Sequence, residues 1–240
     1  MKTVFLMDLD GTLYSGKNPL PYAPEFINYL NANNYKYLAL TNCPSKTQKQ
    51  VSKKLRAMKI DIAPDRILTS GMAAAKILSE KYMIESAFVL GTNALKQEFK
   101  KRGVPVNGKN ARAVVVGYDT ALTYKKLSRA VVLVNSGAML FATNIDNDIP
   151  FGNARIPHTG AIAKAIEFAA GKECVYIGKP QPHMLEIACE MLDCDKSDCV
   201  MIGDRLDTDI AFAVNSGIES YHITNGFSLK EALEIVSKSV

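Results

Sequence analysis

Short apolar runs alternate with amphipathic segments along the first part of the chain. Val4–Met7 and Tyr37–Leu40 are apolar runs of strand length. A helix with apolar residues at helical spacing begins at Pro24, and a second helix is expected over Pro44–Met58. Strands that alternate with helices are typical of a parallel sheet, because each connection has to cross one face of the sheet. The chain is therefore predicted to be an α/β protein with a doubly wound parallel sheet.

The same alternation continues through the middle of the chain. Strands are expected at Ala87–Gly91, Ala113–Gly117 and Met139–Asn144, and a helix at Thr159–Ala170. A long polar loop, Ile145–Ile156, connects the last of these strands to the helix. These units are too many for a surface loop, so they predict a second α/β domain inserted into the first.

The last part of the chain is expected to return to the first domain. Strands are predicted at Cys174–Gly178 and Cys199–Gly203, with helices at Pro182–Leu192 and from Asp207 onward. The domain prediction is therefore a discontinuous core and one inserted domain. The core comprises residues 1–80 and 176–240, and the inserted domain comprises residues 81–175.

Polar residues follow four of the predicted strands. They are Asp8 with Asp10, Thr41 with Asn42, Lys179, and Asp204 with Asp209. Ligands of doubly wound sheets bind at the carboxyl ends of the strands, so these groups are expected to form one site. For Asp-x-Asp-Gly alone, a solvated turn is the alternative, because Asp and Gly are ordinary turn residues.

The residue types of this predicted site suit phosphoryl transfer. Two nearby carboxylates repel each other, and Mg²⁺ is the usual compensating cation where a phosphate also binds. Asp8 is a candidate nucleophile and Asp10 a candidate general acid and base. Thr41, with the backbone N–H groups of the helix expected after it, and Lys179 are candidates for holding phosphate oxygens. Asp204 is expected to bind the metal with Asp8, and Asp209 to hold Lys179 or a metal-bound water.

Composition excludes some other classes of protein. The chain has 29 basic and 24 acidic residues, a net charge of +5, and its basic residues are scattered, so no nucleic-acid polymer is expected as a partner. No apolar run approaches the roughly 20 residues of a membrane span, and no membrane partner is expected. The five cysteines form no Cys-x-x-Cys pair and are interpreted as reduced thiols of a cytoplasmic protein. A zinc site from Cys189, Cys194 and Cys199 is the alternative.

Four motifs, taken together and in this order, resemble those of the haloacid dehalogenase-like (HAD) hydrolase superfamily. They are Asp8-Leu9-Asp10-Gly11-Thr12, Leu40-Thr41-Asn42, Gly178-Lys179-Pro180, and Gly203-Asp204-Arg205-Leu206-Asp207-Thr208-Asp209. The insertion between the second and third motifs resembles the 4-nitrophenylphosphatase/NagD-like branch. That branch usually has Asn where this chain has Cys43, a difference that bears on substrate affinity or turnover.

The resemblance implies a Rossmann-like HAD core and an inserted cap that closes over the site. It implies that Asp8 is the nucleophile and Asp10 the general acid and base, that Thr41, Asn42 and Lys179 hold the phosphate, and that Asp8, Asp10 and Asp204 bind Mg²⁺. The expected activity is hydrolysis of a small phosphomonoester through an aspartyl-phosphate. The substrate could be a nucleoside monophosphate, phosphoglycolate, pyridoxal phosphate or a sugar phosphate.

The sequence leaves the substrate contacts, the oligomeric state and some alternative functions of this expected phosphatase undecided. Asn144 and Asp146, at a strand exit of the inserted domain, are candidate substrate contacts. A homodimer formed through the cap is a property of similar proteins. The alternative functions are a phosphometabolite-binding protein with the same fold, a phosphotransferase of the mutase type, and a metal-independent dehalogenase. Asp8, Asp10, Lys179 and Asp204 argue against a pure binding protein, and Asp204 with Asp209 favours the phosphatase over the dehalogenase. The mutase shares the same chemistry and stays open.

Overall fold

The computed structural model describes residues 4–224 and 227–237 and contains two compact units. The first unit comprises Met1–Thr41, Gln48–Leu68 and Lys179–Val240, and the second comprises Asn42–Thr47 and Thr69–Gly178. The first is therefore discontinuous in sequence. The predicted core and cap domains have other bounds, and their assignment stays a prediction.

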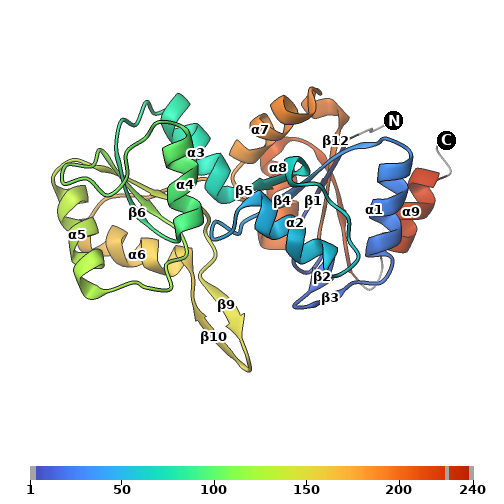
Figure 1. Cartoon of the computed structure of the whole chain (residues 1–240), viewed down its shortest axis with the longest axis horizontal. Coiled ribbons are helices and arrows are strands. Elements are labelled where there is room, and N and C mark those ends of the chain that lie inside the picture. The colour runs from blue at the N-terminus through green and yellow to red at the C-terminus, as the bar shows by residue number, and fades with distance from the viewer. Residues whose placement is uncertain (1–3, 225–226, 238–240) are drawn as a thin grey trace. The chain divides into compact units, whose positions relative to one another are not determined.

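A five-stranded sheet lies at the centre of the first unit, in the order β13-β12-β1-β4-β5 (Figure 1). β1 pairs in parallel with both β4 and β12, and β12 pairs in parallel with β13, which confirms the predicted parallel sheet. The chain adds β4 on one side of β1 and later β12 on the other, so the strand order reverses at β1, where doubly wound sheets bind ligands. The strands of the first unit are β1 (Val4–Met7), β2 (Tyr14–Ser15), β3 (Asn18–Pro19), β4 (Lys36–Thr41), β5 (Ile67–Thr69), β12 (Cys199–Gly203) and β13 (Glu219–His222).

The helices of the first unit bury apolar residues, and the first, second and last of them share one core. Phe26, Ile27 and Leu30 of the first helix are fully buried, at the spacing that predicted this helix. The last helix packs beside it (Figure 1) and adds Leu229 and Val236 to the same core. These helices are α1 (Ala23–Ala32), α2 (Gln48–Arg56), α7 (His183–Leu192), α8 (Ala211–Ser216) and α9 (Leu229–Ser237).

The second unit has its own four-stranded parallel sheet, in the order β11-β8-β7-β6. Its helices α5 and α6 pack against each other, as do α3 and α4. The apolar strands and the helices α5 and α6 form a separate core. The elements are α3 (Ser70–Glu80), β6 (Ala87–Leu90), α4 (Asn93–Lys101), β7 (Ala113–Val116), α5 (Tyr124–Asn135), β8 (Met139–Ala142), β9 (Asp148–Phe151), β10 (Ala154–Pro157), α6 (Thr159–Ala170) and β11 (Val175–Tyr176).

The helix predicted from Pro44 is wrong at its start, because α2 begins only at Gln48. Residues 42–47 are a loop of the second unit, and hydrogen bonds from elsewhere in that unit occupy its carbonyl groups. The Ser70 hydroxyl donates to the Asn42 carbonyl at 2.8 Å, and the Thr92 hydroxyl donates to the Ser45 carbonyl at 3.1 Å. These carbonyls therefore do not serve a helix, and no helix N-terminus follows Thr41 directly.

Three further predictions are corrected, two of them by the strand pairing. The expected loop Ile145–Ile156 contains an antiparallel hairpin, β9–β10, which turns through Gly152 and Asn153. The strand at Cys174–Gly178, expected to return to the first domain, is the short β11, and it pairs with β8 in the second sheet. The helix expected from Asp207 begins as a π-helical turn, Leu206–Ile210, before α8.

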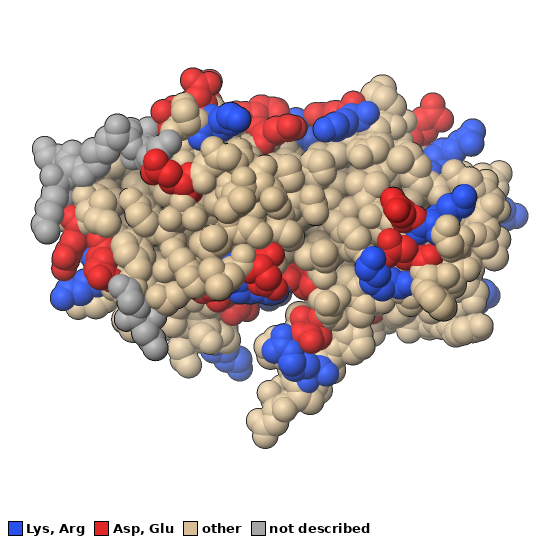
Figure 2. Space-filling view, turned by 180° about the vertical axis from the view of Figure 1, so that it is seen from behind, with Lys and Arg blue, Asp and Glu red and all other residues tan. Residues whose placement is uncertain are grey.

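Basic and acidic side chains are interspersed on the face shown in Figure 2, and the described residues there form no continuous basic stripe. Within residues 4–224 and 227–237, every helix is too short or too polar to cross a membrane.

Candidate active site

The first motif places a carboxylate at the carboxyl end of the central strand. Asp8 follows β1 directly, and its backbone N–H donates to the Ile202 carbonyl of β12 at 2.9 Å. Leu9 is buried in the core, whereas Asp10 is exposed in the turn that follows. Gly11 completes this turn with a φ of 96°, a backbone conformation that glycine adopts without a steric penalty. The turn therefore holds Asp8 at the end of the sheet and leaves Asp10 accessible.

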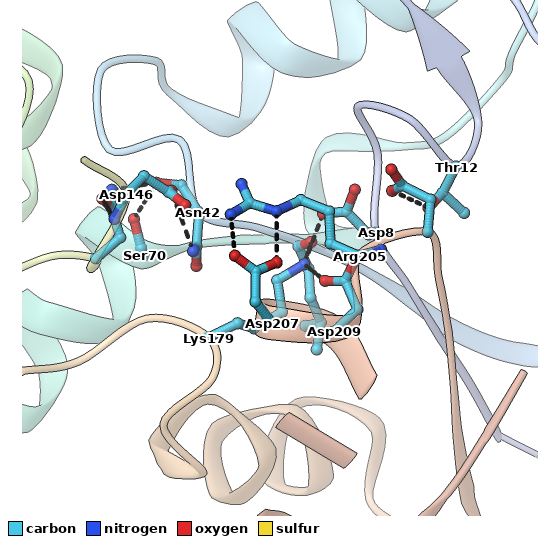
Figure 3. Close-up of polar contacts among 12 residues, drawn as sticks. Asp8, Thr12, Asn42, Ser70, Asp146, Lys179, Arg205, Asp207 and Asp209 are labelled. Atoms are coloured by element: carbon cyan, nitrogen blue, oxygen red, sulfur yellow. Dashed lines mark hydrogen bonds and ion pairs between the residues drawn. The ribbon is translucent and has the colours of Figure 1, made fainter. Parts of the chain in front are cut away.

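Lys179 is the centre of the site (Figure 3). Its Nζ atom lies 2.6 Å from Oδ1 of Asp8 and 2.7 Å from Oδ1 of Asp209, and it donates to the Leu40 carbonyl at 3.1 Å. The side chains of Lys179 and Asp209 are each only 1% exposed, so water does not screen these contacts. Charge-assisted hydrogen bonds of this length orient both carboxylates. Because Leu40 precedes Thr41, the same ammonium also contacts the end of β4.

The end of β12 supplies two more carboxylates. Oδ1 of Asp204 accepts a hydrogen bond from the Thr12 hydroxyl at 3.0 Å, and Oδ2 of Asp209 accepts one from the Arg205 backbone N–H at 3.2 Å. Asp209 lies on the π-helical turn, which directs its side chain back toward the strand end. Ligand oxygens of Asp8, Asp204 and Asp209 all lie within 4.8 Å of one another. The first and fourth motifs therefore meet, as the sequence predicts.

Two glycines allow this close approach. A Cβ atom on Gly11 would lie 2.2 Å from Oδ2 of Asp204, and one on Gly203 would lie 2.3 Å from Cβ of Asp209. Both distances are far inside van der Waals contact, so any larger residue would displace a carboxylate. No role in positioning Asp204 or Asp209 was predicted from the sequence for Gly11, Thr12 or Gly203. Their positions next to the carboxylates in the motifs were the available signal.

The charges of the cluster shift the protonation equilibria of its members. Burial raises the pKa of Asp8, Lys179 opposes this shift, and Asp209 adds to it, so that the pKa of Asp8 rises to about 7. Burial also raises the pKa of Asp204. Burial lowers the pKa of Lys179, but Asp209 and Asp8 outweigh it and hold that pKa above its usual range. Lys179 is therefore an ammonium at neutral pH.

The cluster has the chemistry of a site for a hard divalent cation. Three carboxylates face one ammonium, and burial raises the pKa of Asp8 and of Asp204, so a cation beside these two groups would favour their ionised forms. Mg²⁺ binds oxygen ligands about 2.1 Å away, so two ligands of one ion lie at most about 4.2 Å apart. Oxygens that lie within 4.8 Å of one another therefore need only small shifts to share one ion. Asp8 and Asp204 could hold such a cation, with Asp209 occupied by Lys179.

The second motif is divided between the two units. Thr41 is the last residue of β4 and is buried in the first unit, whereas Asn42 is the first residue of the loop 42–47 in the second unit. In the second unit, the side-chain amide of Asn42 donates to Asp146 at 3.2 Å, and its carbonyl accepts from the Asn144 amide at 2.7 Å. Asn42, Asn144 and Asp146 are thus brought together.

The contacts of Asn144 indicate that it holds a neighbouring loop in place. Its side chain is fully buried, and besides its bond to Asn42 its oxygen accepts from the Asp146 backbone N–H at 3.1 Å. It thereby fixes the loop that follows Thr41. The sulfur of Cys43 lies 3.3 Å from the Ser45 hydroxyl, a contact within the same loop. The proposed roles of these residues toward substrate stay predictions.

Asp207 lies in the fourth motif but outside the carboxylate cluster. It forms an exposed ion pair with Arg205, with N···O distances of 3.0 and 2.7 Å (Figure 3). The Arg205 side chain lowers the pKa of Asp207, so this carboxylate is ionised and is neutralised by its neighbour. The sequence predicts Asp209 and not Asp207 as part of the site, and the structure likewise brings Asp209 to Lys179 and leaves Asp207 with Arg205.

Family models match both ends of the chain. One described as haloacid dehalogenase-like hydrolase matches residues 5–105, and one described as HAD-hydrolase-like matches residues 176–239. The chain is 38% identical to an acid sugar phosphatase of Staphylococcus epidermidis over 237 residues, which are 98% of this chain and 91% of that protein.

Solved structures of phosphatases have the same fold. A 4-nitrophenylphosphatase of Thermotoga maritima superposes with a TM-score of 0.89 at 31% identity and covers 97% of this chain and 96% of its own. NagD of E. coli K-12 superposes with a TM-score of 0.87 at 29% identity, over 94% of this chain and 89% of its own. These likenesses extend over both compact units and confirm the resemblance inferred from the motifs.

Proposed function

Because the chain belongs to the NagD-like branch of the haloacid dehalogenase-like hydrolases and is a phosphoric monoester hydrolase, we propose that it hydrolyses a small sugar phosphate through a phosphorylated Asp8. Lys179 carries this proposal, since one buried ammonium holds Asp8 and Asp209 at 2.6 and 2.7 Å. A purely binding site does not need a carboxylate held in this way.

The first half of the reaction transfers the phosphoryl group to Asp8. A carboxylate oxygen of Asp8 forms a bond to phosphorus while the bond between phosphorus and the ester oxygen breaks. Asp10, exposed two residues further on, gives its proton to the leaving alkoxide. Lys179 stabilises the negative charge that spreads over the transferred oxygens.

The second half of the reaction returns Asp8 to its starting state. Asp10, now a carboxylate, removes a proton from a water molecule, and the resulting hydroxide attacks phosphorus. The bond between phosphorus and Asp8 breaks, and inorganic phosphate leaves. Atoms and charges balance because the proton lost by Asp10 in the first half is regained in the second.

We propose Mg²⁺ as the cofactor, held by the side chains of Asp8 and Asp204 and by the backbone carbonyl of Asp10. When bound, Mg²⁺ neutralises negative charge on the carboxylates and the phosphate. Thr12 and Gly11 keep Asp204 in place for this purpose, through the hydroxyl contact and the absence of a Cβ atom. Thr41 and Asn42 are proposed to hold the remaining phosphate oxygens.

The name of the staphylococcal relative supports a sugar phosphate as the substrate of this chain. A nucleoside monophosphate, phosphoglycolate and pyridoxal phosphate are the competing substrates. In the second unit, Asp146 and the hairpin β9–β10 are proposed to contact the leaving group. A cytoplasmic location and a homodimer formed through the second unit remain proposals from the family resemblance.

The test is hydrolysis of 4-nitrophenyl phosphate and of a panel of natural phosphate esters, with Mg²⁺ and with a chelator. We expect activity that requires the metal, is abolished in Asp8→Asn, and is highest with sugar phosphates. The matched control is Asp207→Asn, which removes a carboxylate of the same motif outside the cluster and should keep the activity. Full activity in Asp8→Asn would contradict the mechanism, and preference for another ester would contradict the substrate class.

A further inference from the structure

Three of the five cysteines meet at one place in the first unit. Cys189 lies in α7, Cys194 follows the end of that helix, and Cys199 begins β12. The sulfur of Cys199 is 3.9 Å from that of Cys189 and 3.8 Å from that of Cys194, and all three sulfurs lie within 4.8 Å of one another. All three are free thiols.

The spacing of the sulfurs matches that of ligands around one metal ion. A Zn–S bond is about 2.3 Å long, so two sulfurs at tetrahedral positions are separated by about 3.8 Å. Two of the separations in the cluster, 3.8 and 3.9 Å, have this value. Soft thiolate ligands select thiophilic ions such as Zn²⁺ over hard ions such as Mg²⁺.

The surroundings of the cluster leave room for a further ligand. Cys199 is buried, whereas Cys189 and Cys194 are partly exposed. Cys194 lines a hollow on the surface of the first unit together with Asp198 and Lys36, so the cluster has one member beside solvent. The Asp195 carbonyl also lies 3.7 Å from the Cys199 sulfur.

The thiols have little to gain from one another without a metal ion. Their contacts with one another are weak S–H hydrogen bonds. A bound Zn²⁺ replaces these contacts with metal–sulfur bonds and releases the thiol protons to solvent.

We propose that Cys189, Cys194 and Cys199 form a second metal site, which binds Zn²⁺ through three thiolates and a water molecule. The site joins the end of α7 to the start of β12. Asp204 follows the other end of β12, and a strand rises about 3.3 Å per residue, so the five residues of β12 separate the two sites by more than about 13 Å. The bound ion therefore stabilises the fold around β12 and takes no part in the chemistry at Asp8.

Co²⁺ is the probe for this site, because cobalt–thiolate bonds absorb strongly in the near ultraviolet and cobalt–carboxylate bonds do not. The full chain, reduced and saturated with Mg²⁺, is titrated with Co²⁺ alone. We expect charge-transfer absorption that saturates at one ion per chain, and loss of this absorption when Zn²⁺ is added. Zn²⁺ should also raise the melting temperature of the protein.

Matched variants assign the absorption to the cluster. Cys194→Ser removes a partly exposed sulfur and should abolish most of the absorption and the Zn²⁺-dependent rise in melting temperature. Cys174→Ser, at a partly exposed cysteine of the second unit, should leave both unchanged. Asp204→Asn should also retain the absorption, because it alters only the carboxylate site.

Three results would overturn the proposal. They are absence of the charge-transfer band in the reduced protein, an undiminished band in Cys194→Ser, and a loss of two hydrogens in mass on mild oxidation without any metal binding by the reduced protein. The last result would assign the cluster to a disulfide instead of a metal site.

Discussion

Replacement of Lys179 by methionine tests how much the buried ion pairs contribute to the fold. Methionine has a similar length and volume but no charge, so Lys179→Met leaves Asp8 and Asp209 without their partner. At an effective dielectric constant of about 20, one ion pair at this distance contributes about 6 kcal/mol of Coulomb energy before desolvation is subtracted. The ligand oxygens of the two aspartates lie within 4.8 Å of one another, so their repulsion alone amounts to about 3 kcal/mol.

We therefore expect Lys179→Met to lower the free energy of unfolding by about 3–5 kcal/mol at pH 8, the usual cost of removing one partner of a buried pair. The loss should shrink at pH 5. The pKa of Asp8 in the folded variant then lies further above the unfolded value of about 3.9, because burial and the charge of Asp209 raise it and the lowering effect of Lys179 is gone. A raised carboxyl pKa contributes stability that is present at low pH and is lost as pH rises through the folded-state value.

The measurement is urea denaturation followed by far-ultraviolet circular dichroism at both pH values, in the presence of a chelator. Urea is preferred to guanidinium chloride because the latter screens charges, and circular dichroism is needed because the chain has no tryptophan. Lys101→Met is the control, since Lys101 forms an exposed pair with Glu98 and should cost less than about 1 kcal/mol. A loss below about 1 kcal/mol for Lys179→Met at pH 8, or an equal loss at both pH values, would refute the reasoning.

Three further predictions concern the same site and its supporting loop. Gly11→Ala should weaken Mg²⁺ binding at least tenfold, because the new Cβ would lie 2.2 Å from Oδ2 of Asp204; isothermal titration calorimetry should show this, and unchanged affinity would disprove the close approach. The affinity of the wild type for Mg²⁺ should fall by up to tenfold per pH unit below about pH 7, because Asp8 must lose a proton to bind the ion. This dependence should become shallower in Asp8→Asn, where Asp204 is the remaining ligand carboxylate with a raised pKa. Asn144→Leu should lower the free energy of unfolding by about 1–3 kcal/mol, because the Asp146 N–H loses the Asn144 oxygen and the Asn42 carbonyl keeps only its bond from Ser70. An unchanged urea midpoint would count against these hydrogen bonds.

Periodic apolar segments made most of the fold predictable. The predicted strand Cys199–Gly203 and the predicted helix Thr159–Ala170 have the bounds that the structure shows, because each combines a strong apolar pattern with a clear start and end. The hairpin β9–β10 was missed because its residues are mostly exposed and follow no apolar period. Its two-residue turn, Gly152-Asn153, is a hairpin signal that a search for turns would have found.

Contacts between residues far apart in the chain could not be predicted from local sequence patterns. The two residues of β11 are only partly buried, and nothing in their order tells whether they pair with β8 or with a strand of the first unit. The wrong helix start at Pro44 has a similar cause. The hydroxyls of Ser70 and Thr92, far along the chain, donate to carbonyl groups of the loop 42–47. The sequence of a single helix, strand or loop does not show which distant residues will pair with it.

The candidate site shows the same division between residue type and packing. The motifs supplied the carboxylates and the lysine, and the carboxyl ends of parallel strands predicted that they meet. Which aspartate meets Lys179 depends on the π-helical turn, which buries Asp209 beside the ammonium and leaves Asp207 exposed with Arg205. The need for glycine at position 203 follows from the same turn, because a Cβ atom there would lie 2.3 Å from Cβ of Asp209. Gly203→Ala should therefore displace Asp209 from Lys179 and reproduce part of the Lys179→Met defect, whereas a fully stable variant would show that the turn can move without cost.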